Sequence, residues 1–125
     1  MQEALAHGVP VVGGAVDGIA EQIVTGENGT LLTPSRNRHA LAQYGEICTQ
    51  GPREVYSPLE DNIVEAGILE PAEVAACLVQ WAETPALRRQ LGQQARVRVQ
   101  RDFDLDWYGE RLDDFMQGIV HGPTS

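Results

Sequence analysis

The chain has 125 residues and a formal net charge of −9, from 18 acidic residues and 9 basic residues, all of which are arginine. This length fits one domain at most, and the acidic balance argues against a nucleic-acid binder, which needs a basic surface. No apolar run approaches the roughly 20 residues that span a bilayer, and Met1-Gln2-Glu3 lacks the basic start of a secretory signal, so we expect a cytoplasmic protein without a transmembrane segment.

Residues 1–34 predict two short strands on either side of a helix. The helix that begins the chain should end at His7, with Gly8 as its C-terminal stop. The apolar run Val9–Val12 is typical of a strand that is covered on both faces, as in a parallel sheet. The glycine-rich turn at 26–29 then leads into a second strand, Thr30–Thr33.

The segment between these strands predicts a glycine-rich loop, Gly13–Gly18, followed by a helix, Gly18–Val24, with Asp17 as its N-cap. Strand, helix and strand in this order predict adjacent parallel strands with a right-handed crossover. Because backbone amides at a helix N-terminus can bind phosphate, the loop is a candidate binding site. A tight turn without a ligand remains the alternative.

The middle of the chain gives weaker patterns. Arg38–Ile47 favours a helix, whereas 48–70 mixes Gly, Pro and charged residues without a stable period, and we interpret it as a loop or insertion. Cys48 and Cys77 have neither C-x-x-C spacing nor a histidine at metal-ligand distance along the chain. We therefore expect two reduced thiols and no metal site.

The last third of the chain predicts three helices. Proline at the first helical position marks two starts, at Pro71 and at Pro85. The segment 103–107 should break the second helix before a third begins. Apolar residues recur at helical spacing in each helix: Val74, Leu78 and Trp81; Leu87, Leu91, Ala95 and Val99; Tyr108, Leu112, Phe115 and Ile119.

The order of motifs in Gln2–Pro34 closely resembles the group 1 family of retaining glycosyltransferases, the glycogen-synthase-like enzymes of the GT-B fold. The motifs are E-A-x-A-x-G-x-P-V-V, a glycine loop, G-I-x-E-x-I and G-x-N-G-x-L-L-x-P. The resemblance implies an α/β fold with a partial doubly wound, Rossmann-like parallel sheet, the C-terminal half of a GT-B donor domain, and a helical last third. Residues 1–103 would belong to the nucleotide-sugar-binding domain, and 104–125 would form a terminal amphipathic helix and tail.

The same resemblance implies donor-binding residues. Glu3 matches the second glutamate of the family's two-glutamate signature and would accept hydrogen bonds from the ribose hydroxyls. Gly13, Gly14 and Gly18 would approach the diphosphate, and Glu21 matches the glutamate of the family's Gly-Gly-x-x-Glu element, although Asp17 replaces its first glycine. No catalytic residue is identified, and neither a metal nor a cofactor is implied beyond a nucleotide-sugar donor such as a UDP- or GDP-sugar.

The expected function is the transfer of a sugar (a hexosyltransferase reaction in carbohydrate biosynthesis) from a nucleotide-diphosphate donor to an acceptor hydroxyl. The first signature glutamate and the N-terminal acceptor domain would precede Met1. We therefore expect a fragment of a longer parent enzyme that is inactive alone.

Two alternatives to this function remain. A dinucleotide-binding module would need an acid after the second strand, where Thr33-Pro34-Ser35 has none. A non-catalytic remnant would form a homodimer through exposed apolar faces.

The histidines and the arginines of the second long helix are not expected to be catalytic. His7 lies at the end of a helix, and His39 and His121 have no partner close in sequence. The arginines of the second long helix favour a solvated face, with a membrane-surface or anionic-acceptor role as the minor alternative. They are Arg88, Arg89, Arg96, Arg98 and Arg101.

Overall fold

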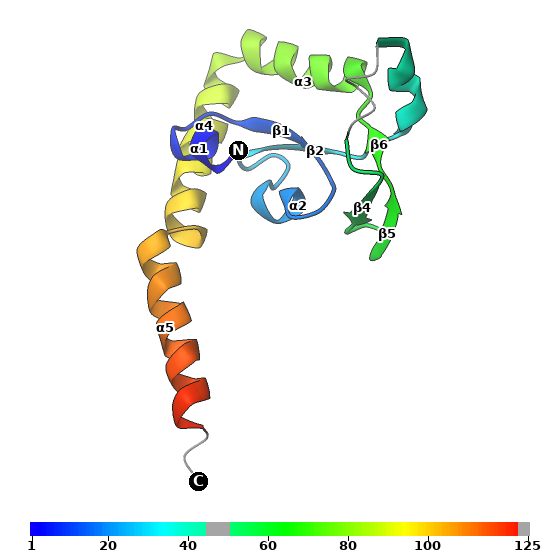
Figure 1. Ribbon diagram of the computed structural model, residues 1–125. Coiled ribbons are helices and arrows are strands. Elements are labelled where there is room, and N and C mark those ends of the chain that lie inside the picture. The colour runs from blue at the N-terminus through cyan, green and yellow to red at the C-terminus, as the bar shows by residue number, and fades with distance from the viewer. Residues whose placement is uncertain (45–50, 123–125) are drawn as a thin grey trace.

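A computed structural model describes residues 1–44 and 51–122, and it shows a mixed α/β chain (Figure 1). The elements in order are α1 (Gln2–Ala6), β1 (Val11–Gly14), α2 (Ile19–Gln22), β2 (Gly29–Leu32), β3 (Arg36–Asn37), the 3₁₀ helix η1 (Arg38–Tyr44), β4 (Glu54–Ser57), β5 (Asn62–Glu65), β6 (Gly67–Ile68), α3 (Pro71–Glu83), α4 (Pro85–Asp102) and α5 (Leu105–His121). The helix predicted over 38–47 is a 3₁₀ helix as far as Tyr44, and its last residues, like Cys48, lie outside the described ranges.

The two N-terminal strands pair in parallel, which confirms the strand–helix–strand prediction. β1 and β2 lie in the register Val11↔Gly29, and α2 connects them. The first strand begins two residues later than predicted. Gly8 has φ +74°, and the amide of Val9 donates to the carbonyl of Ala4 at 2.9 Å, so the chain is still closing α1 at Val9. Pro10 has no N–H, and β1 therefore starts at Val11.

The described residues form three two-stranded sheets rather than one wide sheet. β3 pairs with β6 and β4 pairs with β5, both antiparallel. The interpretation of 48–70 as a loop is therefore wrong for 54–57, 62–65 and 67–68, which form strands. Val55 lies opposite Val64, and a turn at 58–61 joins the two strands. This hairpin lies beyond the carboxyl ends of β1 and β2 (Figure 1).

The three long helices begin close to their predicted starts. Pro71 and Pro85 are the first residues of α3 and α4. The four-residue spacing on α4 marks its packed face, because Leu91 and Ala95 are buried where α4 packs on α1. On α3 Trp81 is buried and Val74 is half-buried, whereas Leu78 is exposed, so the apolar stripe predicted there is covered only in part.

The final helix begins with a side-chain cap. The carboxylate of Asp104 accepts hydrogen bonds from the amides of Asp106 and Trp107, both at 3.0 Å. These bonds cap α5 directly after the short non-helical segment that follows α4. From this cap α5 extends away from the sheets and the other helices (Figure 1). Every residue from Leu105 to His121 is exposed.

Candidate functional site

The candidate site is the segment that links β1 to α2, at the carboxyl end of β1. The loop predicted over Gly13–Gly18 is shorter than expected, because Gly13 and Gly14 are the last two residues of β1. A Cβ on Gly13 would lie 2.8 Å from Ile23 Cδ1 and 2.9 Å from Ile19 Cγ2. Glycine at this position therefore allows α2 to pack closely on the strand.

Most amides of this loop already have backbone acceptors. The N–H of Ala15 donates to Leu32 O at 2.9 Å, and the N–H of Val16 donates to Gly14 O at 2.8 Å. The amides of Asp17 and Ile19 are also bonded within the chain. Among loop amides 15–19, only the N–H of Gly18 has no partner in the described part of the chain. Gly18 is thus the donor of this loop that remains for a ligand.

Asp17 fixes the loop to the hairpin. It has φ +46°, a conformation that aspartate tolerates better than most residues. Its Oδ1 accepts from the amide of Tyr56 at 2.8 Å, and its own amide donates to Tyr56 O at 2.9 Å. The prediction that Asp17 caps α2 is wrong, since Gly18 occupies the N-cap position without a side-chain hydrogen bond.

The two candidate glutamates lie on different short helices. Glu3 is in the first turn of α1, which packs on α4, and Glu21 is in α2, which contacts β1. Both residues are exposed. Across residues 1–44 and 51–122, no hydrogen bond or ion pair joins either carboxylate to the Ala15–Gly18 loop. α2 covers Ile19–Gln22 rather than Gly18–Val24, and four residues are too few for a strong helix dipole.

The G-x-N-G turn has a structural role that the sequence analysis did not assign. Asn28 is fully buried; its Oδ1 accepts from Val24 N at 2.7 Å and its Nδ2 donates to Gln22 O at 2.8 Å. This amide side chain therefore satisfies backbone groups that the end of α2 leaves open. The motif closes the helix and directs the chain into β2.

Four of the five arginines of α4 are exposed, as predicted for a solvated face, but Arg98 is half-buried. Arg96 Nε donates to Ala6 O at 3.1 Å, at the end of α1. Arg98 is only 16% exposed, donates to Glu21 O at 3.1 Å and lies 3.7 Å from the carboxylate of Glu27. α4 thereby supplies hydrogen-bond donors to carbonyl groups in the last turns of two short helices, which have no partner within the helix.

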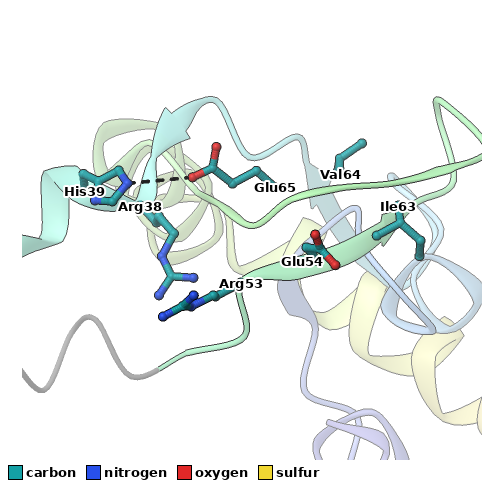
Figure 2. Close-up of a pocket in the computed structure, with 7 residues that line it drawn as sticks. All are labelled: Arg38, His39, Arg53, Glu54, Ile63, Val64 and Glu65. Carbon is teal, nitrogen blue, oxygen red and sulfur yellow. Dashed lines mark ion pairs between the residues drawn. The ribbon is translucent and has the colours of Figure 1, made fainter.

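A polar groove lies beside the hairpin and was not predicted (Figure 2). It has a volume of about 730 Å³, and it is lined by residues of η1, by both hairpin strands and by the residue before β4: Arg38, His39, Arg53, Glu54, Ile63, Val64 and Glu65. His39 Nε2 lies 4.0 Å from Glu65 Oε1, but both side chains are well exposed, so this pair adds little stability. The signal for this hairpin was a pair of short runs, 54–57 and 62–65, each with adjacent β-branched or aromatic residues, on either side of a turn that contains Pro and Asp.

The hairpin turn contains a hydrogen bond that gives a testable titration. Tyr56 donates its phenolic O–H to Asp61 Oδ1 at 2.6 Å, and this bond raises the pKa of Tyr56 above its ordinary value of 10.0. Because the folded-state pKa is the higher one, the bond stabilises the fold below pH 10, and this contribution is lost as the pH rises through the folded-state pKa.

We expect Asp61→Asn to lower the pKa of one tyrosine, measured by absorbance at alkaline pH, because the charged acceptor is removed. Asparagine tolerates the φ of +48° at this position, so the turn is preserved. Asp106→Asn, on α5, is the control and should leave the titration unchanged. An identical titration of wild type and Asp61→Asn would show that the phenol does not bond to Asp61 in solution.

Within the described residues, no group of three or more histidine, cysteine, aspartate or glutamate side chains could hold a metal ion, and no helix is long and apolar enough to cross a membrane. No protein-family model, curated protein or solved structure matches the chain. The interpretation of the site therefore depends on its own residues.

Proposed function

We propose that the chain forms part of the nucleotide-sugar donor site of a retaining glycosyltransferase. The observation that supports this best is the parallel pairing of β1 with β2 through α2, which places the Ala15–Gly18 loop at the carboxyl end of β1. Open α/β sheets bind ligands at this edge. In this proposal β1 and β2 are two strands of a wider, doubly wound sheet.

Each polar group has a role in the proposed site. Glu3 accepts hydrogen bonds from the ribose diol, because a carboxylate offers two oxygens to neighbouring hydroxyls. The free amide of Gly18 donates to the diphosphate. Glu21 lies next to the sugar, and Gly13 allows α2, which carries Glu21, to pack closely on β1. The Tyr56 amide holds Oδ1 of Asp17 at the hairpin, and the proposal requires the diphosphate to bind on the side of the loop away from this carboxylate.

The reaction breaks the bond between the anomeric carbon and the diphosphate oxygen and forms a bond from that carbon to the acceptor oxygen, and the proton of the acceptor hydroxyl passes to the leaving diphosphate. The leaving diphosphate needs positive charge for its stabilisation. Arg96, Arg98 and Arg101 are already bonded to carbonyl or carboxylate oxygens. We infer that the positive charge for the leaving diphosphate, and the groups that hold the acceptor, come from other parts of the parent enzyme. This chain alone should then bind the donor without transferring sugar.

Glu3→Gln tests the proposal by isothermal titration calorimetry with UDP- and GDP-sugars. We expect the variant to weaken donor binding by roughly 1–3 kcal/mol, the scale of a hydrogen bond to a charged group. Glu73→Gln is the matched control, because Glu73 is an exposed glutamate in the first turn of α3. The proposal is wrong if the wild-type chain binds no donor, or if Glu3→Gln binds as tightly as wild type.

A further inference from the structure

α5 carries a line of exposed apolar residues with coiled-coil spacing. The steps between them alternate between three and four residues, which places them at the a and d positions of a heptad repeat. We call this line the α5 seam: Leu105, Tyr108, Leu112, Phe115 and Ile119. These side chains are between 47 and 82% exposed, and α5 has no buried residue. A helix of 17 residues is marginal in water without packing on one face, so the seam needs a partner.

The charges of α5 indicate which partner fits. In the same heptad its acids fall at positions b, c and f, on the side away from the seam: Asp106, Glu110, Asp113 and Asp114. The positions beside the seam, e and g, hold Gly109, Arg111, Met116 and Gly118. Arg111 is the one charge there, and its guanidinium lies 4.7 Å from the centre of the Trp107 ring. In a chain of net charge −9, the seam itself is therefore almost neutral.

A basic partner helix would find no acid beside the seam to bind. A second α5 would meet an apolar seam of the same width. The edges of that seam hold two glycines, a methionine and one arginine, and its acids lie on the other side of the helix. Two identical chains related by a twofold axis use the same patch on each copy, and this interface must be complementary to itself. The α5 seam satisfies that condition, because pairing it with a copy brings no two acids face to face.

We propose that the α5 seam pairs with the α5 seam of a second copy of this chain, in a two-stranded coiled coil. This inference is independent of the proposed donor site, which lies on other elements. α5 also extends away from the rest of the chain, so the coiled coil can form without displacing α4 (Figure 1).

Leu112→Glu tests the pairing by light scattering after gel filtration. Small interfaces bind weakly, so the full chain is loaded between about 5 and about 200 µM. We expect the wild-type mass to rise with concentration from 13.6 kDa towards twice that value. Leu112→Glu should remain at 13.6 kDa throughout, because it places a carboxylate in the middle of the seam.

Val120→Glu is the matched control, since Val120 is an apolar α5 residue, 74% exposed, at position b. It should associate like wild type. Circular dichroism provides a second readout: the helical signal per residue should rise with concentration in wild type and in Val120→Glu, but not in Leu112→Glu. A wild-type chain that stays monomeric, a Leu112→Glu variant that associates normally, or equal loss in both variants would overturn the proposal.

Discussion

Gly29→Ala is expected to destabilise the fold by about 3 kcal/mol, at the upper end of the range for overpacked sites. A Cβ at residue 29 would overlap the carbonyl oxygen of Val11, which lies directly across the parallel pair. The obstacle is backbone rather than a flexible side chain, so β1 and β2 would have to separate. Urea unfolding followed by circular dichroism measures the change in the free energy of unfolding.

Gly109→Ala is the control for this substitution. Gly109 is inside α5, and no atom lies within 4 Å of a Cβ placed there. Alanine favours a helix over glycine by roughly 0.5–1 kcal/mol, so this variant should be as stable as wild type or slightly more so. If Gly29→Ala unfolds at the same urea concentration as wild type, β1 and β2 do not approach each other as described.

Asn28→Ala is expected to cost about 1–3 kcal/mol, since it leaves the part-buried N–H of Val24 and the part-buried carbonyl of Gln22 without their partner. The loss should appear in the same urea experiment. Hydrogen exchange gives a local readout, because the amide of Val24 donates directly to Asn28 and should lose its protection.

The control makes the same change at an exposed asparagine. Asn62 begins β5, and its side chain bonds only to the neighbouring amide of Ile63. Asn62→Ala should change stability by less than about 0.5 kcal/mol, as is usual at the surface. Equal effects of the two substitutions would mean that Asn28 is not the buried link between α2 and β2.

The sequence predicted the parts of this fold that short-range chemistry determines. Gly8 ends α1, Pro71 and Pro85 begin helices, and apolar runs around a glycine-rich turn lead to a parallel pair of strands. Each of these signals depends on neighbours within a few residues. The link between β1 and α2 could be proposed as the candidate site for the same reason, because its signals lie within a few residues. Two glycines of the predicted loop, Gly13 and Gly14, belong to β1 instead.

Other features depend on partners far along the chain and could not be predicted. Asp17 bonds to Tyr56, 39 residues later, and Arg98 bonds to the carbonyl of Glu21, 77 residues earlier. Nothing around Asp17 distinguishes it from an ordinary N-cap, and nothing around Arg98 distinguishes it from a surface arginine. The hairpin in 54–65 was missed for a different reason. Each of its strands has only two adjacent apolar or aromatic residues between polar ones, so neither shows the alternation that marks a half-buried strand.

The most direct test of the proposed donor site is to map amide resonances while a UDP- or GDP-sugar is added to the isotopically labelled full chain. The account predicts saturable shifts at Glu3 and along Ala15–Gly18, largest at the free amide of Gly18, with α5 unaffected at a constant protein concentration. Resonances that do not move, or shifts confined to the groove around Arg53 and Glu65, would contradict it.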